Sequence, residues 1–407
     1  MKMMLLFEIR KIFSRFKNRF AALLLLIVLG ITSILAINKV EYVDENGNST
    51  TGITAAANLR AVREPWSGYL TEEVLKKALE ENAVVNASPE VNSTDIKEQN
   101  KGYAKSQGFL EIRDMISSAF SGWKDYDYYA ADSVSPDEAG MVYERRISQL
   151  KTFLDSGEEY FSEAEKDYLI GHFEDLETPF YYESVTGWDA LLRDISTFIL
   201  ILALFIGFFI SGIFSDEFQT KADAIFFSAK FGRSRAAGAK IGAGFLITTV
   251  FYIVFIFLYT MIVLGVTGFQ GAGCPIQLTL WRSVYNITYF QAYLLIVGAG
   301  YVGTLFAGAL AMLCSAVTRS TAAAVVVPFI ILCAFPFLSR IITLPQICSF
   351  FPDQLMEVYL HIKDFDLVEI GGKVMSVATL IIPVYAAVSL LLQPVVYLVY
   401  RKSEVRN

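Results

Sequence analysis

The chain has 407 residues, of which 54% are hydrophobic, and its mean hydropathy of +0.45 is too high for an ordinary soluble enzyme. The formal net charge of −7 is unevenly distributed: residues 38–188 hold 29 acidic and 14 basic side chains, so the rest of the chain is basic. All four cysteines lie outside 38–188, which excludes a disulfide scaffold there. No nucleic-acid partner is expected.

Six apolar segments are long enough to cross a bilayer, which takes about 20 residues for the ~30 Å hydrocarbon core. They contain no Asp, Glu, Lys, Arg or His and lie at 20–37, 195–214, 241–266, 291–317, 322–338 and 375–400. The fifth is the shortest and contains Pro328 and Pro336, which makes its limits the hardest to place. The sequence therefore predicts an all-α membrane protein with six transmembrane helices.

Lysine and arginine near the span ends predict which side is cytoplasmic. Fifteen of these residues lie on the side of the two termini, against four in the two short loops of the other side. We therefore expect a multi-pass protein of the cell membrane with cytoplasmic termini and an extracellular domain over 38–190. The membrane domain would occupy 191–407, with an extracellular segment at 339–374 and a short cytoplasmic tail. A cleaved signal peptide is the competing interpretation, but the first apolar run exceeds ~7–15 residues and lacks an A-x-A site.

Residues 1–19 are predicted to form a cytoplasmic amphipathic helix in the membrane interface, ahead of the first span at 20–37. The apolar stripe comprises Leu5, Ile9, Ile12, Phe13, Phe16 and Phe20, and the opposite face holds Glu8, Lys11, Arg15 and Asn18. Such a helix lies flat, with its bases attracted to anionic headgroups. Two interpretations stay open, an anchor that leads into the first span and an element that couples to a partner.

The extracellular domain, 38–190, is predicted to be mainly helical, because strand-like alternation is hard to find over 60–180. Helix starts are indicated by Ser135 with Glu138, by Ser162 with Glu165, and by Thr71 between Leu70 and Leu75, as capping boxes and a hydrophobic staple require. Its aromatic residues either line a ligand site or form core and rim: Trp66, Trp123, Tyr126, Tyr128, Tyr129, Tyr181 and Tyr182.

Motifs for catalysis are missing from the sequence. The nearest approach to a phosphate-binding loop, Gly232 to Lys240, has the wrong spacing and no following Ser or Thr. Two histidines leave no credible triad and little room for a metal site. The spans lack the ionisable groups that ion-coupled carriers need. We predict a chain that is not an enzyme, with no catalytic residue, metal or cofactor of its own, so that any energy comes from a partner.

The loop at 215–240 is the most specific feature of the sequence. It opens with Asp216 and Glu217, passes an apolar patch at 225–227, and closes with basic residues up to Lys240. An apolar patch on a short cytoplasmic helix is explained if it docks a soluble partner. The alternative is an ordinary basic turn that obeys only the topology rule.

This loop resembles the coupling helix of type-2 ABC exporter permeases. The matching positions are Glu217, Thr220, Phe227, Ser228, Arg233 and Lys240, preceded by Asp216. Residues 345–402 are similar as well, with a Phe350-Phe351-Pro352 turn and a final span that ends at Tyr400-Arg401-Lys402. The likeness covers 1–37 and 190–407, whereas the insertion between the first two spans is similar only to a Gram-positive subset.

The resemblance implies a permease subunit of an ATP-driven exporter, with the coupling helix seated on a separate ABC ATP-binding subunit that holds ATP and Mg. A second permease subunit, identical or homologous, and the lipid bilayer would be the other partners. Charge-free spans favour an amphipathic or hydrophobic substrate, such as a peptide or a lipid-like molecule. The alternative is an ABC-type sensor or mechanical transmitter whose extracellular domain binds a ligand.

Two further sets of residues have open interpretations. A stripe of small residues in the fourth span serves either packing within the chain or a subunit interface: Ala299, Gly303, Ala307, Ala311 and Ser315. Cys274 and Cys348 both lie in predicted extracellular loops, where they either form a disulfide or remain free.

Overall fold

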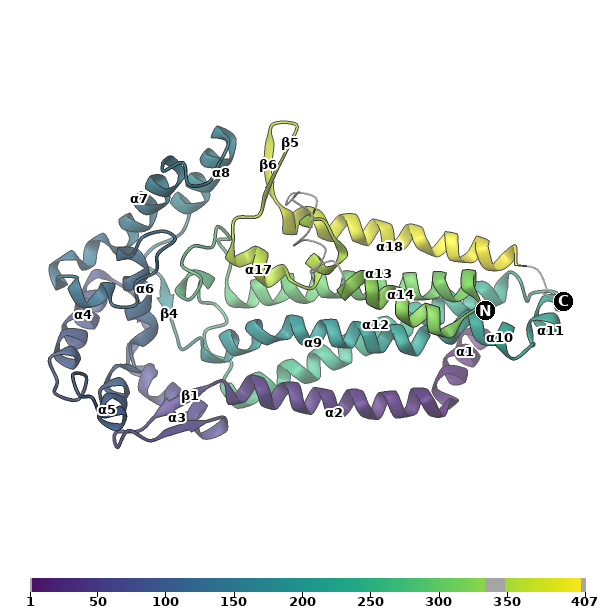
Figure 1. Cartoon of the computed structure of the whole chain (residues 1–407), viewed down its shortest axis with the longest axis horizontal. Coiled ribbons are helices and arrows are strands. Elements are labelled where there is room, and N and C mark those ends of the chain that lie inside the picture. The colour runs from purple at the N-terminus through teal and green to yellow at the C-terminus, as the bar shows by residue number, and fades with distance from the viewer. Residues whose placement is uncertain (1, 334–347, 404–407) are drawn as a thin grey trace.

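Long apolar helices run side by side along most of the elongated molecule (Figure 1). The computed structural model describes residues 2–333 and 348–403. Within these ranges, five helical segments are long and apolar enough to cross a membrane: α2 (Phe16–Asn38), α9 with α10 (Thr186–Gln219), α12 (Arg235–Thr267), α13 (Tyr289–Thr318) and α18 (Val377–Arg401). The chain is therefore a multi-pass membrane protein, and these helices coincide with five of the six predicted spans.

The remaining predicted span, 322–338, begins as α14 (Thr321–Cys333), with Pro328 inside the helix. Thirteen residues of α-helix cover only about 20 Å, and residues 334–338 lie outside the described ranges, as do residues 339–347 of the predicted extracellular segment. Six spans thus stay a prediction. Residues 348–376 form the short helices η5 (Pro352–Leu355) and α17 (Val358–Lys363), followed by the strands β5 and β6.

Between α2 and α9 the chain folds into a separate, mostly helical domain at one end of the bundle (Figure 1). Its helices are α3 (Ile53–Arg63), α4 (Glu72–Asn86), α5 (Ile96–Ser106), α6 (Leu110–Phe120), α7 (Val142–Asp155) and α8 (Glu163–Glu174). Three-residue to six-residue 3₁₀ turns join them: η1 (Glu64–Trp66), η2 (Ala130–Ser133) and η3 (Pro136–Met141). The predicted helical character of this domain is confirmed.

The predicted helix starts are mostly confirmed. Both capping boxes form, at Ser135 before η3 and at Ser162 before α8. Thr71 does occupy the N-cap of α4, and its neighbours Leu70 and Leu75 are buried. Among the described residues, however, no hydrogen bond joins the Thr71 side chain to the first turn of α4, so the staple alone marks this start.

Short strands are present that the all-α prediction missed. β1 (Glu41–Val43) pairs with β2 (Ser49–Thr51), β3 (Gly68–Tyr69) with β4 (Tyr181–Tyr182), and β5 (Leu367–Ile370) with β6 (Lys373–Ser376), all antiparallel. Two to four residues are too few to show the alternation by which strands are recognised. The β3–β4 pair also joins segments far apart in the chain, so only the tertiary fold brings it together.

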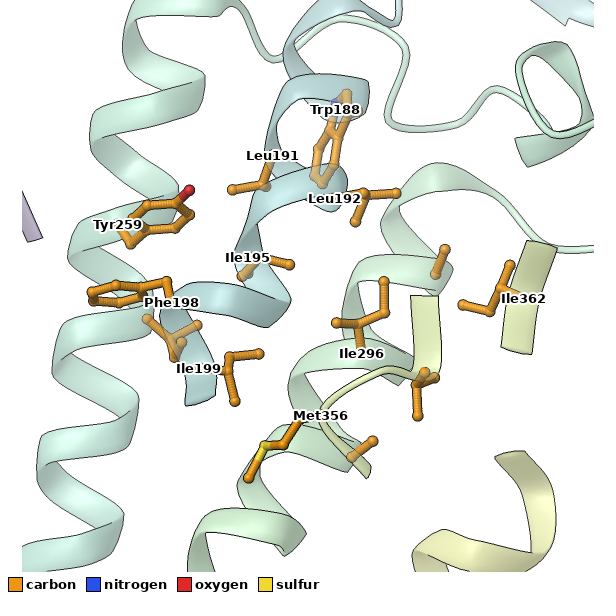
Figure 2. Packing of buried hydrophobic residues seen from close by; sticks show 14 of the residues in the cluster. Trp188, Leu191, Leu192, Ile195, Phe198, Ile199, Tyr259, Ile296, Met356 and Ile362 are labelled. Carbon is orange, nitrogen blue, oxygen red and sulfur yellow. The ribbon is translucent and has the colours of Figure 1, made fainter. Parts of the chain in front are cut away.

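The core of the bundle is centred on α9, whose side chains face two neighbouring helices (Figure 2). On one side Phe198 stacks on Tyr259 of α12, with ring centroids 4.6 Å apart. On the other side Ile195 and Ile199 approach Ile296 of α13. These rings and branched chains are buried, and burial of each large apolar side chain contributes about 1.5–3 kcal/mol.

The separate domain is fastened to the bundle through a buried arginine of α7. Arg146 donates from Nε to the carbonyl of Trp281 (3.2 Å) and from Nη2 to that of Ser283 (3.0 Å). Both acceptors follow η4 (Ile276–Leu278) in the connection between α12 and α13. Ser283 in turn donates from Oγ to the carbonyl of Ile362 in α17 (2.7 Å). Arg146 thus links the domain to the connection between α12 and α13, and Ser283 extends this link to α17.

Candidate coupling site at one end of the bundle

Five elements meet at the end of the bundle that lies farthest from the separate domain (Figure 1): α1 (Lys2–Ser14), α10 (Gly212–Gln219), α11 (Asp223–Ser228), the start of α12 and the end of α18. The predicted coupling loop, 215–240, folds here as α10, α11 and the first turns of α12. Lys221 makes the turn between α10 and α11 in a left-handed conformation (φ 57°). Residues from both ends of the sequence therefore surround this loop.

Glu217 is the centre of a buried ionic cluster. Its Oε1 lies 2.5 Å from Nζ of Lys240 in α12 and 3.1 Å from Nζ of Lys11 in α1. Its Oε2 accepts a hydrogen bond from the hydroxyl of Tyr400 in α18 (2.6 Å). Because the Glu217 side chain is only 3% exposed, these three partners replace the water that a carboxylate normally requires.

Glu8 completes the cluster. Its Oε1 lies 3.0 Å from Nζ of Lys240, which also donates to the carbonyl of Ile213 (3.0 Å) and is fully buried. Two carboxylates, Glu8 and Glu217, therefore balance two ammonium groups, Lys11 and Lys240. Buried charges are tolerated when they are paired and hydrogen-bonded in this way. The cluster holds α1, α10, α12 and α18 together through one set of contacts.

This arrangement corrects the predicted orientation of residues 1–19. The helix ends at Ser14, and Arg15 is extended before α2 begins. The face predicted to meet headgroups turns inward instead: Glu8 and Asn18 are buried, and Arg15 pairs with Asp216. Of the apolar stripe, Ile12 is buried and Ile9 and Phe13 pack against the core, whereas Phe16 and Phe20, which belong to α2, are exposed. The polar face turns inward because α10 and α12 offer it complementary charge.

An aromatic layer lies directly beside the ionic cluster. Phe227 of α11 contacts the ring of Tyr400, with centroids 5.4 Å apart, and that of Phe218 (5.8 Å). Arg233 lies over the other side of Phe227, its guanidinium carbon 4.8 Å from the ring centre. Gly232 follows closely behind α11, and a Cβ there would lie 1.7 Å from the carbonyl oxygen of Phe226. These contacts fix α11 against α10 and α18.

The predicted coupling residues divide into two groups. Asp216, Glu217, Phe227 and Lys240 face the protein and hold the site together. Thr220 and Ser228 are exposed, and their hydroxyls donate to carbonyls of their own helices, those of Asp216 and Ile225. Arg233 is half-buried over Phe227. The outer surface of α11 is instead apolar at Ile225, which is 76% exposed, with Phe231 exposed nearby.

Sequence reasoning missed three members of the site: Glu8, Lys11 and Tyr400 were not among the coupling residues. One signal was available, because Glu8 is the only acidic residue among the first 19. A single carboxylate in a basic, interfacial segment is explained if it pairs with a buried cation. Nothing in the sequence identifies Tyr400 as the partner of Glu217, since the two lie 183 residues apart.

A second polar junction ties α10 to the fourth predicted span. Ser315 of α13 donates from Oγ to the carbonyl of Ser211 (2.6 Å) and accepts from the backbone N–H of Ser215 (2.9 Å). The Ser215 hydroxyl lies 2.9 Å from that of Thr321, at the start of α14. α10 is therefore joined to α13 and α14 as well as to the elements of the ionic cluster.

The other small residues of the predicted stripe, Ala299, Gly303, Ala307 and Ala311, are buried within the chain, as is Ser315. At Gly303 a Cβ would lie 2.7 Å from Cε of Met356, so the helix approaches the η5 segment closely. Burial of all five residues favours packing within the chain over a subunit interface.

Cys274 and Cys348 are both buried free thiols in the structure, so the disulfide alternative is not found. The sulfur of Cys274 accepts a hydrogen bond from the backbone N–H of Glu183 at 3.2 Å. Burial raises the pKa of the Cys274 thiol to about 12, which leaves it protonated and unreactive at neutral pH. The cysteine thus packs the start of α9 against the connection between α12 and α13.

No protein family, curated protein or solved structure matches the chain. The function is therefore argued from the site alone.

Proposed function

We propose that this protein is the permease subunit of an ATP-driven ABC exporter in the cell membrane, with cytoplasmic termini and an extracellular domain over residues 38–190. A separate ATP-binding subunit contacts α11 and hydrolyses ATP with Mg. The exported substrate is amphipathic or hydrophobic and moves outward between two permease subunits. The chain itself is not catalytic.

The observation that carries this proposal is the buried link from Glu217 to Lys11, Lys240 and Tyr400. α11 is a six-residue helix at the tip of the bundle with an exposed apolar side chain, Ile225. A partner that presses on this helix would move α10, and α10 is joined through Glu217 to α1, α12 and α18. Such a site needs no bond-making chemistry, because it transmits displacement.

The proposed contact between α11 and the ATP-binding subunit is tested at the exposed residue Ile225, because changes in the buried ionic cluster would also alter folding. We expect Ile225→Glu to abolish co-purification of an ATP-hydrolysing subunit while the thermal midpoint stays unchanged. The matched control is Ile53→Glu, which places the same change on an exposed residue of α3 and leaves the partner bound. Native purification that yields no ATP-hydrolysing partner, or equal capture by both variants, would contradict the proposal.

A second function is favoured by a different observation, the attachment of the outer domain through Arg146. Arg146 is hydrogen-bonded to Trp281 and Ser283, and Ser283 to Ile362. Through these bonds, a change in the domain on ligand binding would be transmitted to the bundle. This supports the sensor or mechanical transmitter. Deletion of residues 45–185 distinguishes the two functions: export that survives the deletion argues against a required sensing role.

A further inference from the structure

A cleft of about 330 Å³ lies where the separate domain meets the helix bundle. It is bounded by the end of α2, the start of β1, the helices α3, α5 and α6, and the first turns of α9. Three cationic and three anionic side chains line it: Lys39, Arg63, Arg193, Glu41, Glu111 and Asp189. The cleft is within the size range of small-molecule sites, and its formal charge sums to zero.

The inner wall of the cleft is a fixed, buried ion pair. Arg63 pairs with Glu111 and donates to the hydroxyl of Thr186 (2.7 Å). Glu111 also accepts a hydrogen bond from the hydroxyl of Tyr182 (2.9 Å). Less than an eighth of either charged side chain is exposed. The wall therefore presents a guanidinium and a carboxylate in fixed positions. Because these groups are already ordered, a ligand binds without the loss of affinity that ordering them would cause.

The outer rim consists of two ion pairs whose cations are exposed. Lys39 lies 2.5 Å from Asp194, and Arg193 pairs with Asp189 one turn earlier in α9. Lys39 is 49% and Arg193 is 55% exposed at the side chain. The carboxylates are mostly buried, with Asp194 22% and Asp189 24% exposed. An incoming anionic group can therefore reach the exposed side of either cation while its carboxylate stays paired.

The position of the cleft relative to the membrane-spanning helices identifies its surroundings. Lys39 directly follows the last residue of α2, and Asp189 and Arg193 lie in the first two turns of α9. Just below Lys39, the outward face of α2 carries Ile31, Ile34 and Leu35, all more than half exposed. A polar cleft above an apolar helix face matches the boundary between lipid headgroups and acyl chains.

We propose that this cleft binds the headgroup of a zwitterionic phospholipid, with the acyl chains against α2. The phosphate is held by Lys39 and Arg193 at the rim, and the ammonium by Glu41 and the ring of Tyr103, since cations bind over aromatic faces. An anionic lipid satisfies only the cations and leaves the carboxylates facing its charge. The proposal is independent of any ATP-binding partner.

The test uses the purified full-length protein in detergent, incubated with equimolar phosphatidylethanolamine and phosphatidylglycerol of identical acyl chains, with retained lipid counted by native mass spectrometry. We expect wild-type protein to retain about tenfold more of the zwitterionic lipid. The variant Glu41→Gln, which lacks the carboxylate that holds the ammonium, loses this preference, and the double variant Lys39→Gln, Arg193→Gln, which lacks both phosphate ligands, retains less of either lipid. The matched control, Lys76→Gln with Lys151→Gln, removes two lysines of similar exposure with one ion pair each and keeps both the preference and the amount of lipid retained.

A separate arm establishes the source of the headgroup. Glycerophosphoethanolamine, which has the headgroup without acyl chains, should not displace the bound lipid at equal concentration. Displacement at that concentration would overturn the lipid assignment in favour of a soluble ligand. Equal retention of the two lipids by wild-type protein, a preference that survives in Glu41→Gln, or undiminished lipid retention in the rim double variant would overturn the site itself.

Discussion

Removal of one charge from the coupling-site cluster is the most direct test of how it works. In Glu217→Gln the amide can still accept the hydrogen bond from Tyr400, but the ionic contacts to Lys11 and Lys240 are lost. Breaking a buried pair from one side costs about 3–5 kcal/mol. Because Lys240 retains Glu8 and the carbonyl of Ile213, we expect a loss near the lower limit, about 3 kcal/mol.

The double variant Glu217→Gln, Lys240→Met separates pairing from simple packing. It removes both charges, and a buried pair can be replaced by uncharged groups at little cost, so its loss should be smaller than the sum of the single losses. The free energy of unfolding is measured by detergent titration of the purified protein, with exposed Glu159→Gln as a control expected within about 0.5 kcal/mol of wild type. Additive losses, or a Glu217→Gln loss equal to the control, would refute the ionic interpretation.

Three further predictions concern the domain and its attachment. Arg146→Met leaves the carbonyl of Trp281 without its donor, at about 1–3 kcal/mol for an orphaned group, and leaves that of Ser283 with only the longer bond from Gln277 (3.4 Å), so we expect faster amide exchange over 276–288 than in Lys151→Met. Cys274 should resist maleimide at pH 8, because burial raises the pKa of its thiol to about 12. After denaturation without reductant, all four cysteines should react with maleimide if they are free. Fewer than four reactive thiols would favour the disulfide instead. Burial raises the pKa of Asp114 from 3.8 to about 6, so the folded state binds a proton more tightly than the unfolded state does. The stability gained from this proton is lost as pH rises from about 4 through 6. Asp114→Asn should therefore flatten the curve of stability against pH in this range, and an unchanged slope would contradict the assignment.

The positions of five of the six predicted spans followed from composition alone, because a charge-free segment of about 20 residues has few alternatives to a transmembrane helix. The buried face of α1 could not be predicted from composition. Its apolar stripe predicted that Glu8 and Lys11 would meet water and headgroups, yet their partners lie 232 and 206 residues away. A helix examined by itself reveals periodicity but not the charges that another helix will present to it.

The sequence drew attention to the segment 215–240 but did not show which of its side chains are buried, and the coupling role of this segment stays a prediction. The apolar patch at 225–227, between an acidic start and a basic end, marked the loop, because docking of a partner would explain such a patch on a short cytoplasmic helix. Which side chains face inward depended on contacts with α1 and α18, so Glu217 and Lys240 proved to be internal and Ile225 external. The short strands were missed for the same reason, since pairing partners determine them rather than local pattern.

The ionic cluster also sets an order of assembly during synthesis. Glu8 and Lys11 emerge first, but Lys240 follows 232 residues after Glu8, a delay of roughly 10–50 s at 5–20 residues per second. Until Glu217 and Lys240 are made, Glu8 and Lys11 have only each other as partners, 4.0 Å apart, and the headgroup region must solvate them. Tyr400 arrives last, so Glu217 gains its final hydrogen bond only when the C-terminal helix is in place. The first helix of the chain is thus among the last to be secured.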